Sequence, residues 1–96
     1  MDTELIIVSE YCSQNRIEPE FLFSLEEVGL VDFIKRNDEY YLYISQLGDL
    51  DRYVRWHYEL SINAEGIDVI QNLMNRINEM QGEISRLKEI IRLLEE

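Results

Sequence analysis

The sequence predicts a mainly α protein, with a small head of helices and one β-hairpin followed by a long C-terminal helix that forms a coiled coil. The last third of the chain repeats apolar residues with a heptad spacing. Before it, two segments with helical spacing flank a short turn, and two strand-like segments rich in Val, Ile, Phe and Tyr flank an Asn-Asp dipeptide. We therefore divide the 96 residues into a head, residues 1–62, and a dimerisation helix, residues 63–96.

The first part of the head is predicted to form a helix, a turn and a second helix. The apolar run Leu5 to Val8 is long enough only for a brief strand or a lead-in, and Ser9 is a suitable N-cap for a helix from Glu10 to about Asn15. Pro19 suits the first position of the second helix, which we expect to end near Val28, before Gly29. The apolar residues of this second helix share one face: Phe21, Leu22, Leu25 and Val28.

The second part of the head is predicted to form a β-hairpin and a third helix. Leu30 to Lys35 and Tyr40 to Ile44 have strand composition, and the Asn37-Asp38 dipeptide between them favours a turn. A third helix begins near Ser45 or Gln46 and continues to about Leu60. Helix, turn, helix and hairpin together predict a winged helix-turn-helix head in which the hairpin is the wing.

The long final helix begins after Asn63, a good N-cap, and carries Glu65 in its first turn. At about 1.5 Å per residue it extends roughly 50 Å, whereas a domain of about 100 residues has a radius of gyration near 13 Å. A head this small cannot cover such a helix, so we expect a homodimer and leave the helix orientation open. We also expect Ile67, Val69 and Met74 to pack on the head. The predicted dimer interface consists of Ile70, Leu73, Ile77, Met80, Ile84, Leu87, Ile91 and Leu94.

The composition restricts the function classes. The net charge is −11, and the first fifty residues carry eleven acidic side chains against Arg16, Lys35 and Arg36. Such a head repels phosphate and attracts basic surfaces, although a merely solubilising surface is the simpler alternative. The sequence shows no signal peptide and no membrane span, and the single Cys12 excludes an internal disulfide, so we expect a cytoplasmic protein.

Residues that could carry catalysis or bind a metal are sparse. His57 is the only histidine, and no second His or Cys lies at metal-ligand spacing from it. Cys12 is expected in the core, with no histidine placed to activate it as a nucleophile. With four glycines and no Gly-rich phosphate loop, the sequence predicts a protein that is not an enzyme and has no cofactor.

Residues 6–31, IIVSEYCSQNRIEPEFLFSLEEVGLV, resemble the opening of a MerR-type winged helix, whose second helix ends in Glu-x-x-Gly-Leu. Here those residues are Glu26, Gly29 and Leu30. The resemblance implies DNA reading, but the second helix carries four Glu and no basic residue, and Tyr41 and Leu42 stand where that family has an arginine in the wing. Because phosphate contacts are made by Arg and Lys, we expect no direct DNA binding.

Residues 54–87, VRWHYELSINAEGIDVIQNLMNRINEMQGEISRL, are similar to the chaperone-modulator proteins of the CbpM type, which are MerR-like. The resemblance implies an inhibitor that binds the J-domain of a DnaJ-like co-chaperone and limits its cooperation with Hsp70. The other hypotheses are a transcription regulator, acting on DNA directly or through a second protein, and a structural adaptor. The acidic and aromatic residues that we expect to bind the partner are Glu18, Glu20, Phe23, Glu26, Glu27, Arg55, Trp56 and Glu59.

Overall fold

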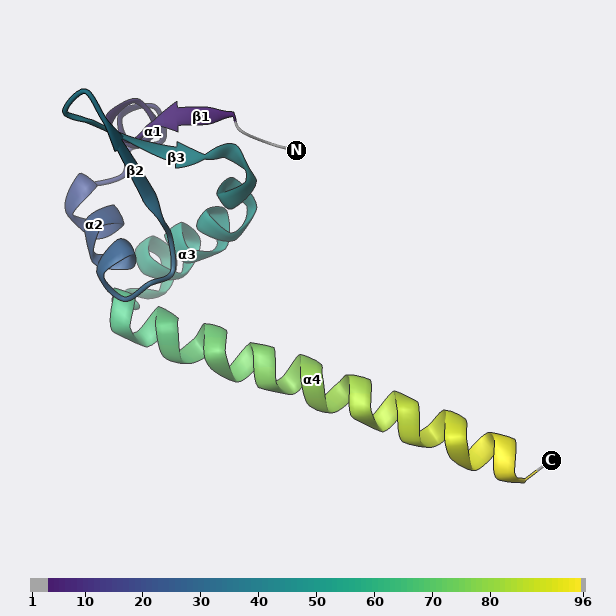
Figure 1. Cartoon of the computed structure of the whole chain (residues 1–96). Coiled ribbons are helices and arrows are strands. Elements are labelled where there is room, and N and C mark those ends of the chain that lie inside the picture. Colours follow the sequence, from purple (N-terminus) through teal and green to yellow (C-terminus); the bar gives the residue numbers. More distant parts are fainter. Residues whose placement is uncertain (1–3, 96) are drawn as a thin grey trace.

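The computed structural model describes residues 4–95 as a compact head from which one long helix extends (Figure 1). The molecule measures 62 × 34 × 20 Å along its principal axes, and the long helix accounts for its elongation. A winged helix-turn-helix with a long C-terminal helix is therefore confirmed. The elements are β1 (Leu5–Ile7), α1 (Val8–Asn15), α2 (Pro19–Glu27), β2 (Phe33–Arg36), β3 (Glu39–Tyr43), a 3₁₀ turn η1 (Ile44–Gln46), α3 (Leu47–Leu60) and α4 (Ala64–Leu94).

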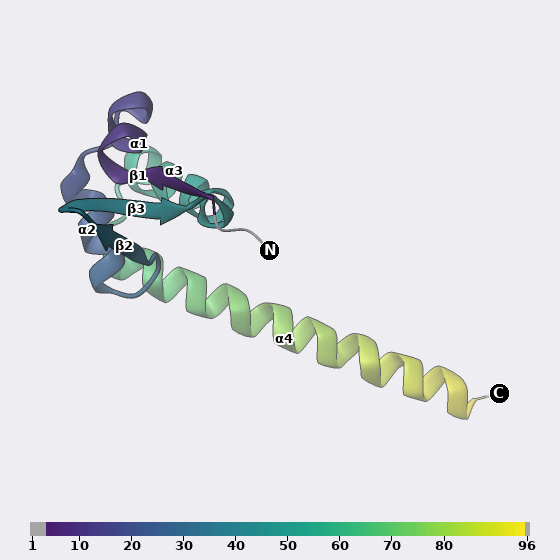
Figure 2. The same ribbon diagram turned by 45° about the horizontal axis from the view of Figure 1, so that its top comes forward.

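The sheet has three antiparallel strands in the order β1-β3-β2. The hairpin β2–β3 was predicted, and the apolar lead-in proves to be the third strand, with Leu5 opposite Tyr43 and Ile7 opposite Tyr41. Asn37 and Asp38 both have positive φ, 52° and 63°, as the tight hairpin turn requires. In Figure 2, α3 lies behind the strands and α1 above them, and Figure 1 shows both helices behind the sheet, so they lie on one side of it.

Several predicted boundaries were wrong by a few residues. The strand β2 begins at Phe33 rather than Leu30, because Leu30 belongs to the turn that ends α2: its N–H donates to the Leu25 carbonyl over 2.9 Å, and Gly29 is left-handed with φ 86°. The strand β3 runs from Glu39 to Tyr43, and Ile44 starts the 3₁₀ turn.

Ser9 does not cap α1. This helix already begins at Val8, because β1 runs into it without a loop, and Ile7, in the N-cap position, has no capping side chain. At two other predicted helix starts the sequence signals were correct: Pro19 is the first residue of α2, and the Asn63 side chain accepts a 2.8 Å hydrogen bond from the Gly66 N–H at the start of α4.

One core joins all parts of the head. Its five fully buried large side chains come from α2, β3, α3 and α4: Leu22, Leu25, Leu42, Leu50 and Ile67. The predicted apolar face of α2 is confirmed, with Phe21 also buried and Val28 packed against the core. Because Ala64 and Ile67 are buried, the first turns of α4 belong structurally to the head.

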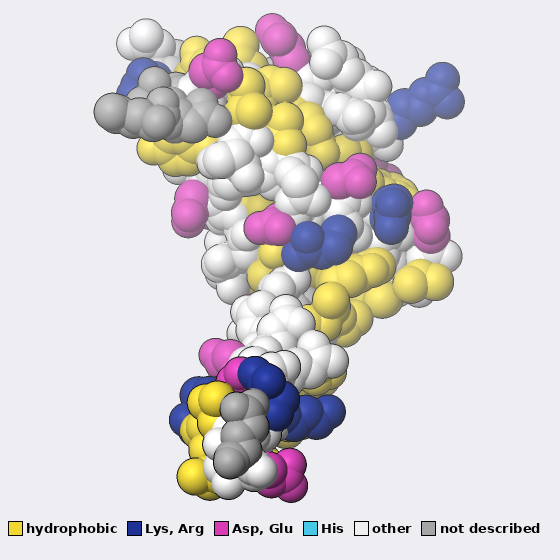
Figure 3. Space-filling view, turned by 90° about the vertical axis from the view of Figure 1, so that its right-hand side faces the viewer, with side chains coloured by type: hydrophobic (Ala, Val, Ile, Leu, Met, Phe, Trp, Pro, Cys, Tyr) yellow, Lys and Arg dark blue, Asp and Glu magenta, His cyan; other side chains and the backbone are white. Residues whose placement is uncertain are grey.

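Beyond its first two turns, α4 leaves the head. Val69 and Met74 are exposed, so the expectation that they pack on the head was wrong. Val69 projects from another side of the helix than the buried Ile67, whereas Met74 lies on the same side two turns further along, where α4 has left the head. Seen end-on in Figure 3, α4 carries hydrophobic side chains along one side and charged groups around the rest. This apolar stripe contains the exposed seam residues Leu73, Ile77, Met80, Ile84, Leu87, Ile91 and Leu94.

The joint between α3 and α4 is tight. Ser61 closes α3 in the left-handed conformation, with φ 59°, and Ile62 then folds back over the start of α4. A Cβ atom on Gly66 would lie 2.8 Å from Ile62 Cγ2 and 3.1 Å from Asn63 Oδ1. Glycine at position 66 thus serves a close approach, in this case by the Ile62 side chain.

We predict that Gly66→Ala destabilises the protein by about 1 kcal/mol, although alanine is the better helix former by a similar amount, because the added methyl group displaces Ile62. The matched control is Gly82→Ala in the same helix, where nothing lies within 4 Å and the propensity gain should appear as added stability. Urea unfolding of both variants measures the two changes, and a stabilised Gly66→Ala would show that the contact is unimportant.

Candidate functional site

The outward face of α2 is acidic and has one aromatic residue at its centre. Glu20, Phe23 and Glu27 are spaced i, i+3 and i+7, so they share the face opposite the buried Leu22 and Leu25, and all three are exposed. The helix contains no Lys or Arg. The acidic charge of α2 is thus displayed outward, on the helix that a helix-turn-helix uses to contact its target.

Phe23 is held in place by aromatic residues of the hairpin. Its ring makes edge contacts with Phe33 of β2 and Tyr40 of β3, with ring centroids 5.3 and 5.4 Å away. It nevertheless remains 38% exposed, as its position off the buried face of α2 predicted. A large apolar side chain that is both exposed and fixed suits a binding surface, because little conformational freedom is lost on association.

A pocket of about 290 Å³ lies where α2, the end of α3 and the start of α4 meet. Three carboxylates line it: Glu18 and Glu20, both predicted site residues, and Glu65 of α4. The pocket wall includes Phe21 and His57, whose rings stack with centroids 3.9 Å apart. Acidic groups beside an aromatic surface can accommodate a Lys or Arg side chain.

His57 has a structural role. Its Nδ1 lies 2.8 Å from the Ile62 carbonyl, and because a carbonyl only accepts, Nδ1 carries the proton and donates. The neighbouring Tyr58 hydroxyl accepts a 2.9 Å hydrogen bond from the Glu18 N–H, which connects α3 to the start of α2. These contacts hold the helices around the pocket in place. The sequence did not predict this pocket, because His57 is an isolated histidine.

The partner-binding residues predicted on α3 have a different environment from those on the α2 face. Arg55 and Glu59 are exposed, and although their i, i+4 spacing would permit an ion pair, they form none with each other in the described structure. An Arg placed N-terminal to a Glu is the weaker orientation of such a pair on a helix. Trp56 is half-buried against the core, 6.2 Å from the Tyr53 ring between centroids. Of the partner-binding residues predicted on α2, Glu26 and Glu27 are also exposed.

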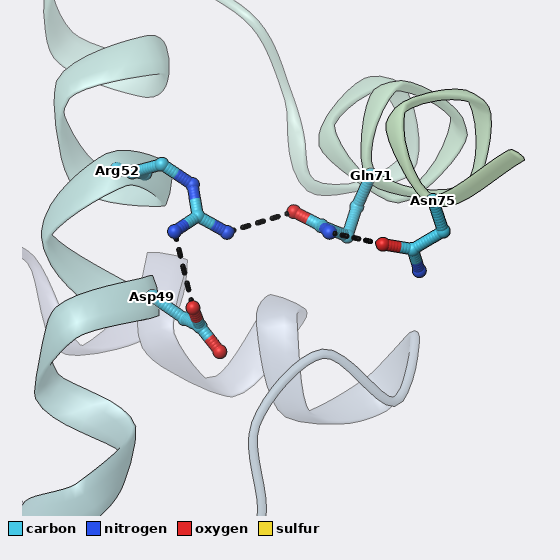
Figure 4. A network of polar contacts seen from close by, with 4 residues as sticks. All are labelled: Asp49, Arg52, Gln71 and Asn75. Atoms are coloured by element: carbon cyan, nitrogen blue, oxygen red, sulfur yellow. Dashed lines mark hydrogen bonds and ion pairs between the residues drawn. The ribbon is translucent and has the colours of Figure 1, made fainter. Parts of the chain in front are cut away.

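Arg52 connects α3 to α4. Its guanidinium donates to Asp49 over 3.1 Å and to the Gln71 side chain on α4 over 3.0 Å, and Gln71 in turn donates to Asn75 (Figure 4). It also lies about 6 Å from the rings of Tyr53 and Trp56. The Asp49–Arg52 spacing is visible in the sequence, but the partner on α4 depends on how the helices cross.

Basic residues near the α2 face come from the hairpin. Between Arg16 and Arg52 the chain contains only Lys35 and Arg36, at the end of β2. Lys35 lies with its Nζ 5.6 Å from the centre of the Tyr40 ring. Two basic side chains at the tip of one hairpin, beside an acidic α2, form a weak phosphate-binding surface.

Comparison with known families decides the general class of the protein. A family model described as MerR HTH family regulatory protein matches residues 6–89. The chain belongs to the MerR HTH family of regulatory proteins. No curated protein and no solved structure matches it. The match covers this MerR HTH chain from the second residue of β1 through the rest of the head and most of α4.

The described part of this MerR HTH chain offers little for metal or thiol chemistry. Within residues 4–95, no group of three or more His, Cys, Asp and Glu side chains could hold a metal ion. Cys12 is buried, and burial raises the pKa of its thiol, which disfavours the reactive thiolate. None of the helices in the same range is long and apolar enough to cross a membrane.

We predict that Arg52→Met destabilises the protein by about 1 kcal/mol, because Gln71 and Asp49 lose their shared donor. Arg55→Met is the matched control: it removes the same charge from the same helix, but no ion pair, and should change stability by less than about 0.5 kcal/mol. Chemical unfolding measures both, and equal effects would mean that the Arg52 contacts contribute nothing beyond charge.

Proposed function

We propose that the protein is a non-catalytic modulator of a DnaJ-like co-chaperone. In this proposal the acidic α2 face binds the basic helical surface of the J-domain and limits its cooperation with Hsp70 in the cytoplasm. The proposal is supported by the resemblance of residues 54–87 to the chaperone-modulator type and, above all, by the charge of α2. The observation that carries it is that Glu20, Phe23 and Glu27 occupy the outward face of the second helix of a MerR HTH head.

Electrostatics favours a basic protein over nucleic acid as the partner. Each Glu placed against a backbone phosphate adds repulsion where binding requires cations. Against a basic helix, the same residues raise the association rate and disfavour wrong partners. The exposed ring of Phe23 would provide the apolar anchor, and the pocket lined by Glu18, Glu20 and Glu65 would receive a Lys or Arg side chain.

We further propose that α4 forms a homodimer through its exposed Ile and Leu stripe. The stripe starts beyond the part of α4 that packs on the head, so it is available to a second copy. Two heads joined in this way would bind two J-domains, or one dimeric co-chaperone, with increased avidity.

The role of the α2 charge in partner binding can be tested directly by substitution. Glu20→Gln with Glu27→Gln should slow association with a purified J-domain roughly tenfold at low salt, because electrostatic steering is lost while shape is kept. Glu10→Gln with Glu79→Gln is the control, since it changes the net charge equally at exposed sites outside α2. Stopped-flow kinetics gives the rates, and binding should weaken as salt shortens the screening length below about 10 Å. Failure of the unchanged protein to bind any J-domain would refute the proposed function.

A transcription regulator is the second candidate, favoured by membership of the MerR HTH family and by Lys35 and Arg36 at the hairpin tip. A gel-shift titration with duplex DNA at low salt distinguishes the two functions. DNA binding with a steep salt dependence would favour the regulator. Binding to a J-domain without binding to DNA would favour the modulator.

The proposed dimer predicts different effects of two adjacent substitutions in α4. Ile84→Lys places a charge in the apolar stripe and should give a monomer, since a buried unpaired charge is strongly unfavourable. Ser85→Lys, on the neighbouring face, should leave the dimer intact. Sedimentation equilibrium of the full chain measures the mass, and an unchanged mass for Ile84→Lys would place the dimer contact elsewhere.

A further inference from the structure

The face of the sheet that points away from the helices is apolar. Residues paired across antiparallel strands point to the same side of a sheet, so the register assigns each side chain to a face. Ile6, Phe33, Tyr40 and Leu42 share the inner face, which packs on the core. The outer face consists of Arg36 and Glu39 at the hairpin tip and five apolar or aromatic residues: Leu5, Ile7, Ile34, Tyr41 and Tyr43.

This composition departs from the usual alternation of an antiparallel sheet, in which one face is buried and the other is polar. The five apolar residues are each partly exposed, and none belongs to the core cluster or packs against it. The helices α1 and α3 of the head lie behind the strands in the view of Figure 1, on the other side of the sheet. A contiguous apolar surface of this kind indicates an interaction site.

We infer that the outer face of the sheet docks an amphipathic helix of a basic partner protein. Its width supports a helix: three strands spaced about 4.8 Å apart span roughly 10 Å, the diameter of a helix with its side chains. The apolar stripe of that helix would lie along Ile34 and Tyr41, at the middle of the face.

The charge of the chain selects a basic partner. Against the net charge of −11, an anionic membrane surface would be repelled, whereas a helix with flanking Lys and Arg would be attracted. Nucleic acid is disfavoured because the one basic residue on this face, Arg36, lies opposite Glu39 in the register. The basic character of the partner rests on the proposed function, and the outer face adds an apolar contact area to the acidic α2 face.

The two surfaces meet at the hairpin. Phe23 of α2 contacts Phe33 and Tyr40 on the inner side of β2 and β3, while the neighbouring Ile34 and Tyr41 point to the outer side. The two surfaces thus lie on opposite sides of the hairpin, and a partner that reaches around its edge would touch both.

The test is the double variant Ile34→Thr with Tyr41→Thr, which makes the face polar and keeps residues with high strand propensity. The matched control is Leu60→Thr, an exposed apolar residue at the end of α3. Two probes are titrated by calorimetry: a purified J-domain, and a synthetic amphipathic helix of Leu and Lys, with a Leu and Glu peptide as its charge control. Thermal unfolding monitors folding, and Leu5→Thr at the sheet edge serves as a milder second variant.

We expect the double variant to bind both probes at least about tenfold more weakly, with Leu60→Thr unchanged and the Leu and Glu peptide not bound. Unchanged affinity of the folded double variant, or of Leu5→Thr should the double variant unfold, overturns the inference and leaves the proposed function standing. Peptide binding that depends on Ile34 and Tyr41, without J-domain binding by the unchanged protein, supports the inference and refutes the proposed function. Binding of neither probe overturns both.

Discussion

The burial of Ile67 under the head determines how the rest of the molecule is arranged. This side chain, with Ala64 one turn earlier, places the start of α4 in the same core as Leu22, Leu42 and Leu50. Because the helix is rigid, fixing its first two turns directs the remaining ones away from the head (Figure 1). The α4 stripe is consequently left uncovered, and the junction that holds α4 also forms the pocket beside Phe21 and His57.

The head has the architecture of a MerR HTH protein, but its second helix carries no basic residue. The outward face of α2 carries Glu20, Phe23 and Glu27. On the outer face of the sheet, Tyr41 lies between Ile7 and Ile34. Within α2 and the hairpin, Lys and Arg occur only near the hairpin tip, whereas phosphate contact would require them on the helix as well. A fold that positions a helix and a hairpin against a target can thus serve protein recognition with the same elements.

Local sequence signals predicted what depends on local interactions. Pro19, Asn63 and the Asn37-Asp38 turn each act within a few residues, and each was placed correctly, as was the long C-terminal helix. Features made by long-range pairing were missed. The apolar outer face appears only once Leu5 and Ile7 are known to pair with β3, and the Arg52–Gln71 contact only once the crossing of α3 and α4 is known. Ser9 was misassigned because a strand entering a helix directly leaves the cap position to Ile7.

Ser61 determines the direction in which α4 leaves the head. One backbone residue at φ 59° reverses the chain between α3 and an α4 of 31 residues. With an arm of roughly 45 Å, a rotation of about 10° at this pivot would move the far end of α4 by about 8 Å, more than a helical turn. In the proposed dimer, the Ser61 joint would set the spacing between the two heads, and any group that loosens or braces this joint would change how far apart two bound partners lie.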